Sequence, residues 1–211
     1  MRKAFVWAAL AAVVVTADGA SAQIEWGPVA GLSLASLSGD DADGFDSRTG
    51  FFAGAQLVWQ RPGSLIGFET GAVYIQKGAE ASEDGVDGAL ELTYIDVPLL
   101  VRIAPPLAGS SFTPAFGLGA NVGFNIDCKL SGESEGVSAD VDCDEAGLEA
   151  KSIDLGLTAS AGVDFPVGTT MMLAPFVSYT FGLTDVDDSE DPADVKNSVI
   201  KIGAALRFGG R

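Results

Sequence analysis

The sequence of 211 residues contains no histidine and only two cysteines, and its cations are few. Without histidine the chain cannot build a histidine-based catalytic triad, a histidine metal site or an imidazole proton shuttle. Only 12 Lys and Arg stand against 29 Asp and Glu, which excludes a nucleic-acid-binding surface. Beyond the N-terminal segment there is no uninterrupted apolar run of about 18 residues, so a membrane-spanning helix is excluded there. We therefore expect no enzyme, and a membrane role would require a β-barrel.

The N-terminal segment has the layout of a cleaved export signal. Two basic residues precede the apolar residues 4–15, and small residues occupy positions 20–22, where a signal peptidase would cut. A membrane anchor is the alternative, but twelve apolar residues form a helix only about 18 Å long, against a hydrocarbon core of about 30 Å. We predict a signal peptide at residues 1–22, cleaved after Ala22, and one domain at residues 23–211. Without the leader the chain has 10 basic and 28 acidic residues, a net charge of −18.

Eight segments in which apolar residues alternate with small or polar ones follow the leader. In the clearest of them Phe116, Leu118 and Ala120 lie on one face of a strand, and Gly117 and Gly119 on the other. A helix would scramble these two sets, so each segment is predicted to be a strand. The segments are residues 24–36, 50–60, 65–76, 91–103, 112–126, 152–165, 170–182 and 198–208.

The segments are long enough to cross a membrane. A strand of about 12 residues, tilted by about 40°, covers about 30 Å of height. The apolar face is predicted to meet lipid, and the small and charged face to line the interior, which is narrow in an eight-stranded barrel. Seven charged residues share the inward parity and are predicted to pair across the interior as a structural plug, with a proton or ion path as the alternative. They are Glu69, Asp96, Arg102, Asp154, Asp164, Lys201 and Arg207.

Aromatic residues recur near the ends of these segments. They could form the aromatic girdles that lie at the two membrane surfaces of such a barrel, although ordinary strand propensity would also supply them. They include Trp26, Trp59, Tyr74, Phe112, Tyr179 and Phe208.

The connectors between the segments alternate between long and short. Outer-membrane barrels have short periplasmic turns and long external loops, so this order predicts a single eight-stranded antiparallel up-and-down transmembrane β-barrel, of the all-β class. The long connectors carry 22 of the 28 acidic and 5 of the 10 basic residues, which places the acidity at one rim. Long connectors are residues 37–49, 77–90, 127–151 and 183–197; short ones are residues 61–64, 104–111 and 166–169.

The longest connector holds both cysteines and a run of alternating aspartates. After export Cys128 and Cys143 reach an oxidising compartment, so we expect a disulfide that closes about 15 residues. Two free thiols binding a metal are the alternative, but further Cys and His partners are lacking. The aspartates at 140, 142 and 144 resemble the start of a calcium loop, yet Glu145 and Lys151 occupy the positions where such a loop needs Gly and Glu. We predict no dedicated metal site, with weak divalent-cation binding at the acidic loops left open.

Four motifs in this order resemble the PorT-like outer-membrane β-barrel family of Gram-negative bacteria. They are G-L-S-L-A-S-L at residues 31–37, G-F-F-A-G at 50–54, Y-I-Q-K-G at 74–78 after an F-E pair, and Y-I-D-V-P-L-L-V-R at 94–102. The last is the most specific, with Asp96 where such sequences often have Glu. The resemblance covers essentially the whole chain after the leader. It implies a Sec-exported barrel in the outer membrane without implying a defined activity.

The final segment resembles the signal by which the barrel-assembly machinery recognises its clients. It combines a polar residue, a glycine and two alternating hydrophobic positions, the second of them aromatic: Lys201, Gly203, Leu206 and Phe208. Three residues follow the aromatic, unlike sequences that end on it. Any last barrel strand would look similar, which is the competing explanation.

Taken together, these features favour a non-enzymatic outer-membrane barrel with a plugged polar interior, acidic external loops and a structural or surface-interaction role. A small pore or passive transporter is the first alternative, and a soluble secreted lipocalin-like carrier the second. The carrier would turn the face of Leu118, Val122 and Phe124 inward. No catalytic residue, cofactor or nucleic-acid partner is expected. The expected partners are outer-membrane lipid, the barrel-assembly machinery during insertion, and an external partner that the sequence does not identify.

Overall fold

The computed structural model describes residues 23–40, 42, 44–83, 86–107, 109–134, 137–148, 150–188 and 194–209. The predicted signal peptide, residues 1–22, lies outside the described residues. In the described part of the chain no helix has the length and apolarity to cross a membrane. The regular elements there are β1 (Gln23–Ser38), β2 (Asp46–Gln60), β3 (Ile66–Glu83), β4 (Val86–Ile103), β5 (Thr113–Ser134), β6 (Val137–Asp142), β7 (Ile153–Val167), β8 (Met171–Asp185) and β9 (Lys196–Gly209).

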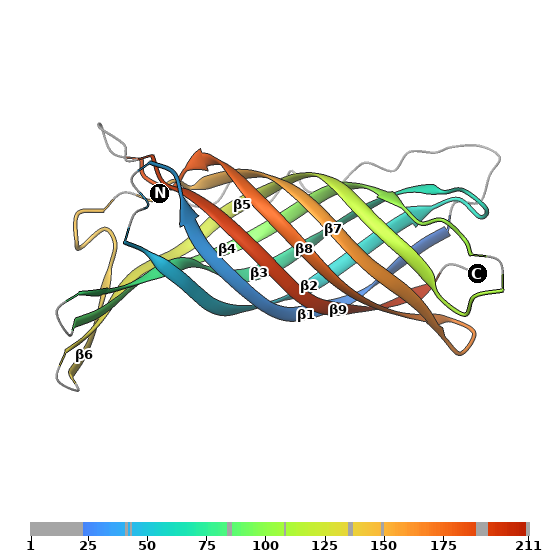
Figure 1. The fold of residues 1–211 in the computed structure, drawn as a ribbon, viewed down its shortest axis with the longest axis horizontal. Coiled ribbons are helices and arrows are strands. Elements are labelled where there is room, and N and C mark those ends of the chain that lie inside the picture. The colour runs from blue at the N-terminus through green and yellow to red at the C-terminus, as the bar shows by residue number, and fades with distance from the viewer. Residues whose placement is uncertain are drawn as a thin grey trace, which may run out of the picture.

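Eight of these strands close into an antiparallel barrel (Figure 1). The strands pair in the order β4-β3-β2-β1-β9-β8-β7-β5, and pairing of β4 with β5 completes the circle. Each strand therefore pairs with its neighbour in the chain, and β1 pairs with β9, which is the up-and-down topology predicted from the sequence. Closure leaves the barrel without an unpaired strand edge. The predicted fold class is confirmed.

The two ends of the barrel differ in the length of their connections. Residues 61–65, 104–112 and 168–170 connect strands at what we call the short-turn end, where β1 begins and β9 ends. At the opposite end, which we call the long-hairpin end, the β3–β4 and β5–β6 hairpins project beyond the barrel (Figure 1). The alternation of connection lengths is thus preserved.

Two of the predicted long loops are largely strand, which corrects their assignment. β3 continues to Glu83 and β4 starts at Val86, so residues 77–90 form a hairpin instead of a loop. β5 continues to Ser134 and pairs with a ninth strand, β6, inside the predicted connector 127–151. The high charge suggested loops, but a strand that projects into water tolerates charge on its outer face.

The apolar face of the barrel strands points outward, as the alternation predicts. Leu118 and Ile202 expose 67% and 64% of their surface, and Phe124 is exposed on the same face. The neighbouring Asn121 and Lys201 are buried. This is the sidedness of a barrel surrounded by lipid and the reverse of a lipocalin-like carrier, whose interior would be apolar.

The interior is less uniformly polar than predicted, because bulky apolar side chains also point into it. Phe52, Ile75 and Leu92 are almost completely buried there and belong to one hydrophobic cluster. Gly31 and Gly203 pair across β1 and β9 and make room for the ring of Phe52. A Cβ on Gly203 would lie 2.6 Å from the Phe52 ring, so this position requires glycine for packing alone.

Aromatic pairs gather at the short-turn end, on or next to the ends of strands that are neighbours in the barrel. Arg61 lies over the ring of Trp59 at 5.7 Å. This arrangement agrees with an aromatic girdle at one membrane surface. The pairs are Trp26 with Phe208, Trp59 with Phe68, and Phe112 with Phe165, with ring centroids 5.6–6.3 Å apart.

Candidate functional site

The interior near the short-turn end holds a first cluster of buried charges, the lower cluster. The Asp164 carboxylate, on β7, accepts from Arg102 on β4 and lies 2.5 Å from an Arg207 nitrogen on β9. Glu69 lies 3.7 Å from Arg102, and Glu25 lies 3.4 Å from Arg207. Both arginines are at most 3% exposed. One carboxylate thus joins two guanidinium groups from opposite parts of the barrel wall, and with the two flanking glutamates three carboxylates face two cations.

A second cluster, the upper cluster, lies nearer the long-hairpin end. The ammonium group of Lys77, 1% exposed, lies 3.0 Å from an Asp96 oxygen and 3.2 Å from an Asp154 oxygen. The same ammonium lies 4.3 Å from the centre of the Tyr94 ring, a cation–π contact. The amide of Asn197 donates to Asp154 as well, at 3.2 Å. These contacts join strands β3, β4, β7 and β9 across the lumen.

Lys201 lies between the two clusters on β9. It is 6% exposed, and no carboxylate in the described part of the chain lies within ion-pair distance of it. Its side chain lines a cavity of about 60 Å³ together with Glu69, Gln56 and Ser178. A cavity of this size has room for a few water molecules.

The seven charged residues singled out by strand parity all point into the barrel, but they form two groups and one separate lysine. Six are at most 7% exposed, and the side chain of Glu69 is 17% exposed. The sequence reasoning missed Lys77, which it placed in a loop. Lys77 has the same parity as Glu69, eight positions earlier, so a longer third strand would have put it inside. Tyr94 could have been found likewise, from the parity of Asp96.

At the long-hairpin end Arg48 and Lys196 are paired with acidic side chains. Arg48 lies 2.9 Å from Glu91, and Lys196 lies 3.0 Å from Asp185 and also pairs with Asp194. A hydrogen bond from Lys196 holds the pKa of Asp194 below its usual value, and the same bond raises the pKa of Lys196. These pairs are partly exposed to water, which screens them and limits the stability that each adds. They leave the excess of carboxylates at this rim uncompensated.

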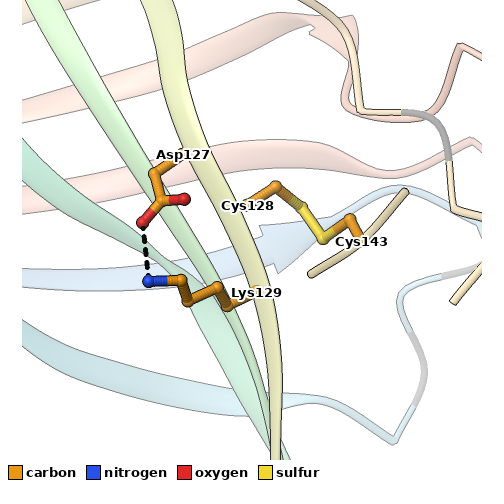
Figure 2. Close-up of a disulfide and its surroundings, with 4 residues drawn as sticks. All are labelled: Asp127, Cys128, Lys129 and Cys143. Carbon is orange, nitrogen blue, oxygen red and sulfur yellow. Dashed lines mark ion pairs between the residues drawn. A yellow bond between two sulfur atoms is a disulfide. The ribbon is translucent and has the colours of Figure 1, made fainter. Parts of the chain in front are cut away.

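The predicted disulfide between Cys128 and Cys143 is present and joins β5 to the turn after β6. Figure 2 shows it on one side of β5, while Asp127 and Lys129 form a 3.2 Å ion pair on the other side. Cys143 is 2% exposed, and its carbonyl accepts a 2.9 Å hydrogen bond from the Leu148 amide. The hydrogen bond that Lys129 donates to the Asp127 carboxylate raises the pKa of Lys129. The disulfide fixes the turn at residues 143–148 against the projecting hairpin.

Replacing both cysteines with serine is expected to destabilise this turn locally by about 3 kcal/mol, because a disulfide that closes about 15 residues restricts the unfolded loop by that amount. Amide hydrogen exchange in β6 and in residues 143–148 should become about 100-fold faster. Exchange in the barrel strands β7 and β8 serves as the internal control and should not change. Equal protection in both forms would contradict this structural role.

The acidic residues once compared with a calcium loop do not converge. Among the described residues no three potential metal-binding side chains come together. Asp142 pairs in register with Lys129, and Asp140 with Ser131, on the outer face of the hairpin. In the last strand Lys201 points inward and Ile202 outward, and Phe208 contacts Trp26 at the short-turn end. The assembly signal read from this strand stays a prediction.

Comparison with known protein families matches residues 17–188 to the family described as "Outer membrane protein beta-barrel domain". Among solved structures the chain is similar to the outer membrane protein OprG from Pseudomonas aeruginosa, with 16% sequence identity, a TM-score of 0.50, and coverage of 89% of this chain and 95% of that chain. Neisserial surface protein A has 16% identity, a TM-score of 0.49, and coverage of 90% and 99%.

A third structure is Ail of Yersinia pestis in complex with the heparin analogue sucrose octasulfate, with 17% identity, a TM-score of 0.41, and coverage of 88% and 99%. At this level of identity the likeness to OprG shows the fold alone. No curated protein matches the sequence significantly.

Proposed function

The chain belongs to the family of outer membrane protein β-barrel domains, and on this premise we propose that it is a plugged, non-conducting barrel whose acidic long-hairpin end faces outward as a surface for interaction. Plugged here means that side chains fill the lumen. The observation that carries the proposal is the pair of ion-pair clusters across the lumen. The cavities beside them are about 60 Å³ next to Lys201 and about 210 Å³ next to Arg102 and Asp164 at the short-turn end.

The size of the barrel supports a plugged lumen. An eight-stranded barrel is just wide enough for side chains to fill, whereas water-filled porins use 16–18 strands. Here the filling is both ionic and apolar, because Phe52 and Leu92 occupy the interior next to the charged clusters. A small pore or passive transporter is the alternative. Such a function would need a continuous path of polar groups through the lumen past Leu92.

Bilayer conductance measurements test the proposal. Purified protein in planar bilayers is expected to give no steady single-channel steps, although the heat-dependent gel mobility of the same sample shows a folded barrel. A variant in which Arg102, Asp164 and Arg207 are all serine provides the control for contaminating porins. Steady steps in the unaltered protein whose size changes in this variant would place the current in this lumen and overturn the proposal.

The finer predictions from the sequence belong to this proposal too. Within the family we place the chain with the PorT-like barrels, supported by the segment Y-I-D-V-P-L-L-V-R, which supplies Tyr94, Asp96 and Arg102 to the interior. Export by a signal peptide that is cleaved near Ala22 and insertion by the barrel-assembly machinery would bring the chain to outer-membrane lipid. Loose binding of divalent cations by the acidic rim belongs to the same proposal.

A further inference from the structure

The sheet that projects at the long-hairpin end has two faces of opposite character. One register row runs across β3, β4, β5 and β6 and is entirely apolar: Ala79, Leu90, Leu130 and Val141. The row beside it is polar and mostly charged: Gly78, Glu91, Lys129 and Asp142. The apolar row continues the inward face of the barrel strands, since Leu92, two residues beyond Leu90, is buried in the interior. The projecting sheet therefore holds an apolar face over the mouth of the barrel.

Other apolar side chains stand opposite this face and make it one wall of a groove. Two adjoining cavities of about 490 and 240 Å³ lie here, and both are lined by Phe45, Leu90 and Leu130. We call the two together the apolar groove. Their combined size is within the range of small-molecule sites. The further apolar side chains that line them are Leu37, Leu92, Leu148, Val141, Val186 and Val195.

The floor of the groove is closed. Leu92 and Val199 are each 1% exposed and belong to the same hydrophobic cluster as Tyr94, whose ring covers the ammonium group of Lys77. A molecule in the groove would thus rest on the upper cluster without entering the lumen. The turn that carries Leu148 is held in place by the disulfide at Cys143.

The charge at the rim determines which ligands with an apolar chain and a polar head group could bind in the groove. Asp187 is the one charged residue among the described residues that line the two cavities. The predicted long connectors carry 22 acidic and 5 basic residues, and one of those five, Lys77, is buried inside the barrel. Arg48, Lys129 and Lys196 are already paired with carboxylates, and Lys151 is the fifth basic residue set against the acidic excess. The rim therefore attracts cations and repels carboxylates, sulfates and phosphates.

We propose that the apolar groove binds the hydrocarbon chain of a small amphipathic cation, whose ammonium group lies at the acidic rim near Asp187. The proposal deepens the proposed function and rests on it for the outward orientation of the long-hairpin end. Apolar burial supplies the affinity, and the rim charge selects the head group.

A titration of the full barrel in lipid nanodiscs tests the proposal with three probes of equal chain length. Decyltrimethylammonium, decyl maltoside and decanoate are added to protein with labelled Leu and Val methyl groups, and empty nanodiscs correct for partition into lipid. Decyltrimethylammonium is expected to shift the Leu90 and Leu130 methyl signals saturably, and to bind about tenfold more tightly than decanoate at low salt. Added salt should reduce this preference.

Three variants locate the site. Val141→Gln and Leu148→Gln should weaken binding of both the cationic and the neutral probe, and both side chains are partly exposed, so the fold tolerates the change. Asp187→Asn should lower the affinity for the cation alone. Glu80→Gln is the matched control, because its exposed side chain lies on the opposite face of β3 from Ala79, and it should leave the neutral probe unaffected.

Each other result overturns the inference. Shifts that do not saturate, or that persist in Val141→Gln and Leu148→Gln, would mean partition into lipid. Preference for decanoate would overturn the charge argument, and self-association abolished by Val141→Gln would assign the groove to a second copy of the chain. If the barrel conducts no current and binds no probe, this inference is wrong, and the proposal of a plugged lumen stands. If the barrel conducts current and also binds the cation, the proposal of a plugged lumen is wrong, and the inference about the apolar groove stands.

Discussion

Replacing Asp164 with alanine is expected to lower the free energy of unfolding by about 3–5 kcal/mol. The carboxylate pairs with both Arg102 and Arg207, which are at most 3% exposed. Its removal leaves two guanidinium groups in a closed lumen, with only Glu69 and Glu25 at longer distances to compensate them. For buried charges the loss of the closest partner costs far more than the loss of a surface ion pair.

Urea unfolding of the protein refolded into detergent micelles or lipid vesicles, followed by tryptophan fluorescence, measures this loss. Asp127→Ala is the matched control, because it also breaks an aspartate–cation pair, but one whose side chains are about half exposed. That change is expected to cost at most about 1 kcal/mol. A loss for Asp164→Ala as small as that of the control would mean that water reaches the lower cluster freely, against a filled lumen.

The second large effect is expected for Lys77→Met, again a loss of about 3–5 kcal/mol. Methionine keeps the apolar stem of the side chain and removes only the ammonium group, which lies within 3.2 Å of both Asp96 and Asp154. Two carboxylates then face each other in the interior, and of the two only Asp154 accepts hydrogen bonds from Asn197 and Thr184. The same unfolding experiment measures the change.

A neutral triple variant separates charge from packing at this cluster. Lys77→Met combined with Asp96→Asn and Asp154→Asn removes every charge of the cluster, and replacing a whole buried ion-pair set by neutral groups is often tolerated. It should recover much of the stability lost in Lys77→Met. Lys129→Met, on the exposed face of β5, is the control and should have little effect. A triple variant no more stable than Lys77→Met would point to packing as the cause.

Both predictions depend on pairings that local sequence could not supply. Lys77 and Asp154 are 77 positions apart and lie on strands that are not neighbours in the barrel. Arg102 and Asp164 likewise face each other across the lumen, on β4 and β7. Which inward charge meets which depends on the stagger between strands and on where the barrel closes, and these follow from all the strand registers together.

The full length of the strands could not be predicted from local sequence either. The charged residues 77–90 and 127–151 looked like loops, yet Ala79, Leu90 and Leu130 keep the strand alternation within them. A strand that leaves the membrane keeps its period of two while its outward face becomes polar. The apolar groove therefore could not be predicted, because it exists only where the projecting sheet meets side chains such as Leu37 and Val195 from other parts of the chain.

The sequence by itself determined that this chain is a closed barrel with its apolar face outward, because side chains alternate strictly along a strand and the parity of residues such as Lys201 and Leu118 can be read residue by residue. It also determined the disulfide, since only two cysteines are available. Only the tertiary structure decided the partners of the inward charges, Lys77 among them, and the groove above that lysine. Those features depend on closure of the barrel, which places strands that are distant in the sequence on opposite sides of one lumen. The width of the lumen and the stagger of the strands follow from all strands together, so no single segment encodes them.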